Sequence, residues 1–315
     1  MIGWLQQLWD TMTAVSLPLL VVGVAFQAAQ TLLVALAWRN ILRSAYPDGD
    51  VRYRPIMSYY AGGTGLNAIL PASAGTVTML GFFRTSIKGA TVAGVIGATM
   101  VENIFFAIVA VLVYLGLFLS TSGSFDVHFG WFADHPTASV IIVVGGIALI
   151  VVAVVVVYHR FRKTWENAKE GGEILRHPRQ FLVQVVGVEA VSYAARMGVN
   201  ATFMRAYHIP VSVENVFLIV AASSISSTVA VLPGAVGAQT GLASVVLRGV
   251  APQATIAAYT VGQALITTAW NVAFGLTMLS TQIGWHDTRK LIHRKKKGEE
   301  PGAATAETAP ASSDP

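Results

Sequence analysis

Five apolar runs of membrane-spanning length dominate this sequence. A helix needs about 20 mostly apolar residues to cross the hydrocarbon core of a bilayer. The runs that meet this length cover residues 15–38, 90–119, 138–158, 181–204 and 254–280. Only 12% of the residues are charged, against about 25% in a typical soluble domain. The sequence therefore predicts an all-α integral membrane protein.

Two further apolar regions are each interrupted by a break that contains proline and glycine. The breaks are Asn67-Ala-Ile-Leu-Pro71-Ala-Ser-Ala-Gly75 and Val231-Leu-Pro233-Gly-Ala-Val-Gly237, and both contain the pattern Leu-Pro-x-x-x-Gly. The apolar arms that leave them, 76–83 and 238–247, are too short to cross a bilayer. Matching broken segments in the two halves of a membrane chain indicate a transport site at the interface of an inverted repeat.

The positions of the basic residues predict how the chain crosses the membrane, because short loops rich in Lys and Arg stay on the cytoplasmic side. All but three of the 21 Lys and Arg residues lie in segments 39–54, 84–88, 159–180 and 289–297. These segments share one side only if both broken regions are re-entrant hairpins that return to the side they came from. The N-terminus is then outside and the C-terminus is cytoplasmic.

The same topology divides the chain into two halves of opposite orientation, each with a spanning helix, a broken hairpin and a long helix. We therefore expect one transmembrane domain over residues 1–285. It is a polytopic bundle with an inverted repeat and two opposed re-entrant helical hairpins. Repeat 1 covers about 15–119, the connecting helix 138–158 and repeat 2 about 181–280, and residues 286–315 form a basic and then disordered cytoplasmic tail.

Short motifs within this pattern are similar to those of a known family. They are Asn67-x-x-x-Pro71-x-x-x-Gly75, Val101-Glu102 in the following helix, and Pro233-Gly-x-x-Gly237 in the second half. In this order and spacing, over roughly residues 15–285, the sequence resembles the flippase-like transmembrane domain of bacterial lysylphosphatidylglycerol synthases. We expect a stand-alone member, because the residues after 285 could not fold into the family's soluble aminoacyl-transferase domain.

The sequence departs from the family pattern at charged positions. Ser73 and Thr76 stand where family members often carry arginine and glutamate, and Asn103 replaces the arginine that usually follows the helix glutamate. In the second half Thr240, preceded by Gln239, takes the place of a glutamate. The predicted site is therefore rich in hydroxyl and amide groups. The resemblance implies translocation of a lipid or lipid-linked substrate, not lipid aminoacylation.

The two breaks supply most of the predicted substrate-binding residues. Proline removes a backbone donor, glycine allows close backbone approach, and the helix N-terminus after each break suits an anionic headgroup such as a phosphate. Arginines at matching places after the breaks can receive a phosphate or anchor the helix by snorkelling. The full set is Asn67, Pro71, Ser73, Gly75, Thr76, Arg84, Pro233, Gly234, Gly237, Gln239, Thr240 and Arg248. The alternative is that the breaks are only hairpin tips packed against each other.

Three charged residues lie within the predicted spans. Glu102 is near the middle of run 90–119, and Glu189 and Arg196, seven residues apart in run 181–204, share one helix face. Because an ionisable group inside a membrane is costly and usually functional, we expect Glu102 or Glu189 to pair with Arg196. Such a pair serves either as a coupling or headgroup site, with Glu102 as a proton carrier, or as a structural ion pair.

The sequence favours a flippase-like transporter that moves a lipid or polyprenyl-linked anionic substrate between leaflets of a bacterial cell membrane. The alternative is a non-transporting partner or scaffold of an enzyme that makes envelope lipids or glycans. We expect no enzyme and no cofactor, because no acid–base set and no metal-spaced histidine cluster stand out. Membrane lipids are the expected partners, and nothing indicates nucleic acid. Association with an envelope-synthesis protein or with a second copy of the chain stays open.

Overall fold

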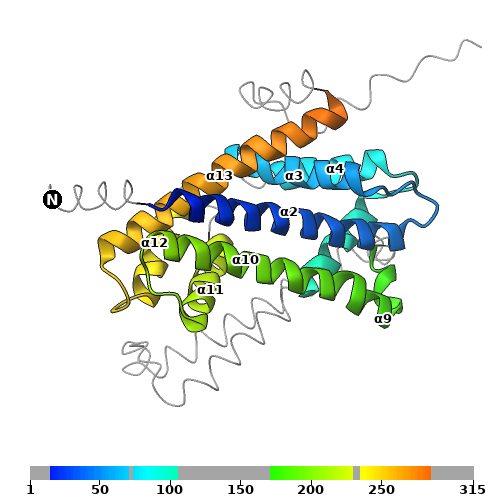
Figure 1. Ribbon diagram of the computed structural model, residues 1–315. Coiled ribbons are helices and arrows are strands. Elements are labelled where there is room, and N and C mark those ends of the chain that lie inside the picture. Colours follow the sequence, from blue (N-terminus) through cyan, green and yellow to red (C-terminus); the bar gives the residue numbers. More distant parts are fainter. Residues whose placement is uncertain (1–14, 71–73, 106–170, 230–234, 285–315) are drawn as a thin grey trace, which may run out of the picture.

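The computed structural model describes residues 15–70, 74–105, 171–229 and 235–284, and the regular elements in these ranges are all helices (Figure 1). The first half contains α2 (Leu17–Ala45), α3 (Tyr53–Ile69), α4 (Ala74–Ser86) and helix 92–105 (Val92–Phe105). The second half contains η1 (Glu173–Arg176), α9 (Pro178–Phe181), η2 (Leu182–Val186), α10 (Gly187–Ala206), α11 (Val213–Val229), α12 (Ala235–Val246) and α13 (Gln253–Ile283). The predicted all-α fold is confirmed for these residues.

Three of the described helices are long and apolar enough to cross a membrane: α2, the continuous helix Pro178–Ala206 that α9, η2 and α10 form, and α13. At 1.5 Å per residue each is roughly 45 Å long, which exceeds the ~30 Å hydrocarbon core. Large apolar side chains on their surfaces, such as Leu17, Val191 and Leu265, are more than half exposed and suit a lipid surrounding. The chain is therefore a membrane protein with spanning helices at three of the five predicted runs. Run 138–158 lies outside the described residues, and run 90–119 is described only as far as Phe105.

Two of these helices extend beyond the apolar runs into the basic segments. Arg39 and Arg43, expected in a loop, lie in the last turns of α2, where their charge is favourable for the helix dipole. The helix ends just before Tyr46 because the proline that follows this residue disfavours a helical conformation for it. Arg179, also expected in a loop, lies in the first turn after Pro178, a residue whose fixed φ suits the first helical position.

Helices α3 and α4 form an antiparallel helical hairpin. Toward its open end Tyr59 stacks on Phe82, with ring centroids 5.0 Å apart. Toward its tip Asn67 Nδ2 donates to Thr76 Oγ1 (2.8 Å), and the Thr76 N–H donates to Asn67 Oδ1 (3.1 Å). In the second half α11 likewise packs against α12. With 13 and 12 residues, α4 and α12 reach only about 20 Å, so these arms are as short as predicted.

The two halves repeat the same order of elements, α2, α3, α4 and helix 92–105 in the first and α10, α11, α12 and α13 in the second. In both halves a glycine with a φ of 82° follows the short helix, at Gly89 and Gly249, and glycine is the residue that adopts this left-handed conformation freely. A tyrosine follows the first helix of each half, and its hydroxyl lies against a glycine of the last helix. The pairs are Tyr46 with Gly94 and Tyr207 with Gly262. The halves thus share both their element order and their turn chemistry.

Helix α2 lies beside α10 and runs in the opposite direction (Figure 1). Near one end of this pair Asn40 Nδ2 donates to the Gln184 carbonyl at 2.8 Å, and further along Phe26 lies against Gly198. Two buried apolar clusters form, one mainly around α2, α3 and α4 but including Ile174 and Val185 of the second half, and the other around α10 to α13. Helix α13 of the second half packs along α3 of the first.

Candidate functional site

One face of α10 carries polar side chains in the middle of a membrane-spanning helix. These residues, which we call the polar stripe, are Glu189, Ser192, Arg196 and Asn200. Their spacing of three or four residues places neighbouring members on one face of the helix. Arg196 is partly buried and the other three are buried. Because a buried polar group without a hydrogen-bond partner is costly, the partners of each member indicate what the stripe does.

Two members of the polar stripe are held by side chains from other helices. Asn200 Oδ1 accepts hydrogen bonds from the Tyr259 hydroxyl and from Gln263 Nε2 of α13, each at 3.2 Å. Asn200 Nδ2 donates to the Arg196 carbonyl at 2.8 Å. The Arg196 guanidinium donates to Ser223 Oγ of α11 at 3.0 Å. This half of the stripe joins α10, α11 and α13 through polar contacts.

Glu189, at the other end of the polar stripe, is 0% exposed. Neither of its carboxylate oxygens has a hydrogen-bond partner among the residues that the structure describes. The predicted pair between Glu189 and Arg196 is therefore wrong. The two residues are two helical turns apart, about 10 Å along the axis, and the arginine is bonded to α11 instead. Glu189 is thus a buried carboxyl group that no counter-charge of the described residues contacts.

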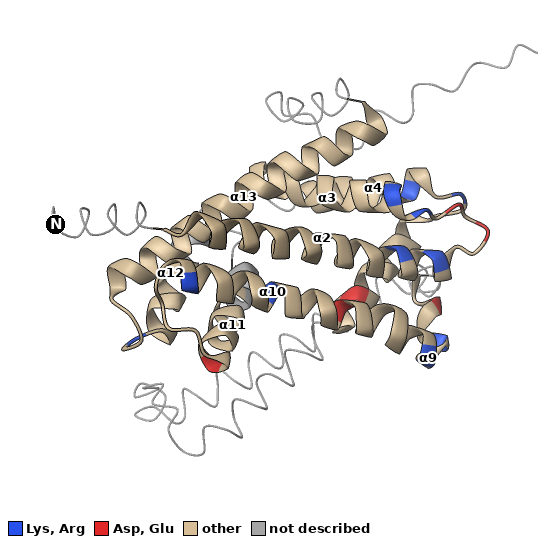
Figure 2. Ribbon diagram, viewed as in Figure 1, with Lys and Arg blue, Asp and Glu red and all other residues tan. Residues whose placement is uncertain are grey.

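A second carboxyl group and a phenol lie near Glu189. Glu102 of helix 92–105 is close enough to Glu189 for their charges to interact. Tyr60 of α3 is also close enough to both carboxyl groups and to Arg196 for its phenol to interact with their charges. Figure 2 shows acidic residues within the length of α10, away from the ends of the bundle where most of the Lys and Arg lie. The structure therefore brings all three predicted intramembrane charges into one region and adds Tyr60.

The first break is closed by its own side chains. Asn67 and Thr76 join the end of α3 to the first turn of α4, so Asn67 supplies an acceptor for a backbone N–H at a helix start. Gly75 is buried, and a Cβ there would overlap the backbone carbonyl of Gly63. These contacts hold the hairpin together. Pro71 and Ser73 lie outside the described residues.

The second break is described only from the start of α12 onward. Gln239 and Thr240 are partly buried on α12, and the Thr240 hydroxyl lies 3.0 Å from the Thr260 hydroxyl of α13. Pro233, Gly234 and the surroundings of Gly237 are outside the described part of the chain. The meeting of the two hairpin tips therefore stays a prediction. Arg84, in the last turn of α4, and Arg248, which follows α12, are both exposed.

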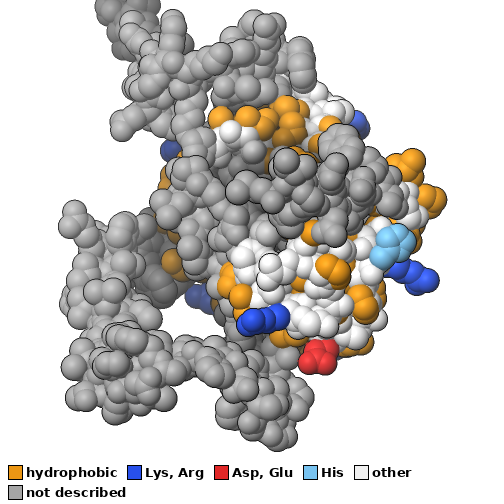
Figure 3. All heavy atoms as spheres, turned by 90° about the vertical axis from the view of Figure 1, so that its left-hand side faces the viewer, with side chains coloured by type: hydrophobic (Ala, Val, Ile, Leu, Met, Phe, Trp, Pro, Cys, Tyr) orange, Lys and Arg blue, Asp and Glu red, His pale blue; other side chains and the backbone are white. Residues whose placement is uncertain are grey.

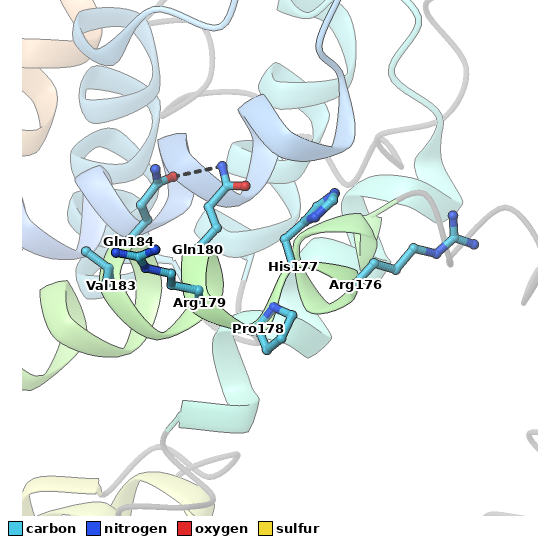
Figure 4. A pocket seen from close by; sticks show the side chains of 7 residues that line it. All are labelled: Arg176, His177, Pro178, Arg179, Gln180, Val183 and Gln184. Carbon is cyan, nitrogen blue, oxygen red and sulfur yellow. Dashed lines mark hydrogen bonds between the residues drawn. The ribbon is translucent and has the colours of Figure 1, made fainter.

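An open hollow of about 670 Å³ lies at the start of the helix Pro178–Ala206 (Figure 4). It is lined by Arg176, His177, Pro178, Arg179, Gln180, Val183 and Gln184. Figure 4 shows that the two arginines extend to either side of His177. Val183 is 66% exposed, so the hollow joins basic groups to an apolar surface. That combination suits an anionic headgroup above apolar chains.

Charge is distributed unevenly along the bundle. Most of the described Lys and Arg residues gather where α9 lies beside the C-terminal end of α2 (Figure 2). The face seen from the other end, in Figure 3, shows apolar side chains with few charged ones among its described residues. The hollow therefore lies at the basic end.

Sequence reasoning missed Tyr60, Asn200, Tyr259 and Gln263, as well as the hollow. A signal was present for some of them. Asn200 follows Arg196 by four residues and Gln263 follows Tyr259 by four, and each spacing places two polar groups on one helix face. The run Arg176-His-Pro-Arg179 lines the hollow, and its sequence indicates a basic segment but not a hollow.

A family model described as the lysylphosphatidylglycerol synthase transmembrane region matches residues 1–275. The match includes both hairpins, the polar stripe and the hollow. No curated protein and no solved structure matches the chain.

Proposed function

Because the chain belongs to the family of the lysylphosphatidylglycerol synthase transmembrane region, we propose that it is a flippase-like transporter. It moves a lipid or polyprenyl-linked anionic substrate between the leaflets of a bacterial cell membrane. The observation that carries the proposal is the buried polar stripe on a spanning helix. Polar and ionisable groups inside a membrane are costly, and they mark substrate or ion pathways.

The arrangement of the two halves supports an alternating-access mechanism. The first helices of the halves, α2 and α10, run antiparallel (Figure 1), as an inverted repeat requires. Arms as short as α4 and α12 suit re-entrant hairpins. The basic end is the cytoplasmic side by the charge rule, which puts the N-terminus outside. The halves rock against each other around a site near the midplane.

The substrate headgroup is received by neutral hydrogen-bonding groups and by arginines at the two ends. Thr76, Gln239 and Thr240 supply hydroxyl and amide groups near the breaks, and the exposed Arg84 and Arg248 follow the two short arms. Acyl or prenyl chains stay in the bilayer, against the exposed apolar surfaces of the spanning helices. No step in this process is a chemical reaction, so we propose a transporter and not an enzyme.

One observation favours the second candidate function, a non-transporting partner of an envelope-synthesis enzyme. The two hydrogen bonds between Asn67 and Thr76 and the close contact of Gly75 with Gly63 hold the first hairpin shut near its tip. A scaffold would show such closed tips on both hairpins. A transporter instead needs a tip that opens during the cycle.

Transport is tested with the purified protein in liposomes. Labelled phospholipids and polyprenyl phosphates are followed between leaflets for the wild type, for Glu102→Gln and for Glu214→Gln, a matched change at an exposed residue of α11. We expect movement in the wild type and in Glu214→Gln, and its loss in Glu102→Gln. If folded wild-type protein moves none of these lipids, the partner function replaces the transporter.

A further inference from the structure

Glu189 is the residue of the polar stripe that carries an ionisable group without a hydrogen-bond partner among the described residues. It is 0% exposed, and both carboxylate oxygens lack a hydrogen-bond partner among the described residues. An ionised carboxylate in such a place has lost its water without gaining a partner, which costs far more than the burial of a neutral polar group. The position is thus unsuitable for a permanent charge.

Within the part of the chain that the structure describes, the groups around Glu189 do not supply a compensating positive charge. On helix 92–105 the neighbour is another carboxyl group, Glu102. On α3 it is the phenol of Tyr60. On α10 itself the nearest cation is Arg196, whose guanidinium is bonded to Ser223 of α11.

Helix α2, which packs along α10, also contributes no charge at this level. The contacts of Asn40 with Gln184 and of Phe26 with Gly198 define the antiparallel register of the two helices. That register places Ala35, which is 0% exposed, level with Glu189. The nearest titratable residue of α2 is Arg39, about one turn away. Its guanidinium bonds to the side chain of Asn40 at 3.2 Å.

Two neighbouring carboxyl groups without a counter-charge do not both ionise, because like charges in a poorly solvated place repel strongly. We propose that Glu189 carries an exchangeable proton beside Glu102, and that this carboxyl pair is the ion-binding site that couples the protein's cycle to a proton gradient. The proton-binding part rests on the burial of Glu189, on its lack of a hydrogen-bond partner among the described residues and on the nearby Glu102. The coupling part rests on the proposed transport function.

The roles of the two carboxyl groups follow from their exposure. Glu189 is enclosed by protein, whereas Glu102 is only partly buried. Glu102 is therefore the group through which a proton enters or leaves, and Glu189 is the group that retains it. Movement of helix 92–105 relative to α10 changes the distance between the two groups and hence the affinity for the proton.

Infrared spectroscopy tests proton binding without any transport. A protonated carboxyl group has a C=O stretching band above the amide bands, and an ionised carboxylate does not. We expect this band at neutral pH in the wild type and in Glu214→Gln, and its loss in Glu189→Gln. Wild-type protein without this band at neutral pH would overturn the proposal.

A labelling experiment on the wild type keeps the proposal testable if Glu189→Gln does not fold. Dicyclohexylcarbodiimide, an apolar reagent, takes the proton of a neutral carboxyl group onto its nitrogen while the carboxylate oxygen bonds to its central carbon. The adduct rearranges to a stable acylurea that keeps the mass of the whole reagent. Peptide mass spectrometry should find this label on Glu189 but not on the exposed Glu214, with less label at alkaline pH. Equal labelling at all pH values, or protection by Na⁺ instead of by alkali, would refute a proton site.

The coupling part has its own readout. In liposomes that show lipid movement, a pH gradient should change its rate in the wild type, and Glu189→Gln should remove this dependence. A protonated Glu189 together with gradient-independent movement would leave the proton site in place and overturn the coupling. A protonated Glu189 without any lipid movement would overturn the transport function instead.

Discussion

The contact between α3 and α13 should be highly sensitive to one added methyl group. Gly275 of α13 is buried against the backbone of α3. A Cβ at this position would overlap the Ala61 carbonyl oxygen and lie 3.1 Å from the Cα atom of Gly65. Both neighbours are backbone atoms, so no side-chain rotation relieves the overlap and the two helices must move apart. Close approach at small residues is a main source of helix association in membranes.

The expected cost of Gly275→Ala follows from this geometry. Overpacking of a tight interface typically costs about 1–3 kcal/mol, and the better helix propensity of alanine returns at most about 1 kcal/mol. At about 2–4 °C per kcal/mol for a domain of this size class, we expect the midpoint of thermal unfolding to fall by several degrees. The assay is thermal unfolding of the detergent-solubilised protein, followed by tryptophan fluorescence.

A matched substitution provides the control. Gly81 is a helical glycine of α4 where a Cβ would meet nothing within 4 Å. Gly81→Ala should therefore leave the unfolding midpoint unchanged or raise it slightly, because only the helix-propensity gain applies. If Gly275→Ala and Gly81→Ala shift the midpoint equally, the close approach of α3 and α13 is not what stabilises this part of the bundle.

Three further predictions concern the polar contacts. Asn200→Ala leaves two buried donors of α13 without their acceptor and should lower the free energy of unfolding by about 1–3 kcal/mol. Denaturant titration in detergent measures this change, and a change within error would show that water replaces the amide. Asn67→Ala should cost about 1 kcal/mol, like the loss of a helix cap, and a double-mutant cycle with Thr76→Val should show that the two changes are not additive. Arg179→Gln in the hollow should weaken binding of anionic lipid, measured by native mass spectrometry with phosphatidylglycerol against phosphatidylcholine, while Arg205→Gln at the other end of α10 should not.

The spanning helices and the short hairpin arms could be predicted from the sequence because both depend on local composition. Apolar length determines whether a helix can cross the bilayer, and proline with glycine interrupts a helix wherever the pair occurs. The ends of α2 and of the helix Pro178–Ala206 were predicted less well. Arginines at a helix end look like loop residues in a hydropathy pattern, although Arg43 and Arg179 are helical.

The candidate site was predicted only in part. Glu102, Glu189 and Arg196 were recognisable because a charge within an apolar run is unusual, and the structure brings them into one region. The Glu189–Arg196 pair was predicted wrongly, since a shared helix face does not determine where a long guanidinium chain reaches, and the alternative pair of Glu102 with Arg196 stays a prediction. Tyr60 carries no such signal, because single polar residues are common in apolar helices of this kind.

By itself the sequence determined an all-helical membrane protein with two apolar regions interrupted by proline and glycine. Both features are local, because the bilayer sets the apolar length of a spanning helix and proline with glycine interrupts a helix. Only the tertiary structure decided which polar groups meet. Arg196 bonds to Ser223, and Glu189 is buried near Glu102 without a hydrogen-bond partner among the described residues. These contacts join residues far apart in the chain, and they depend on the rotation and register with which the helices pack, which no local pattern encodes.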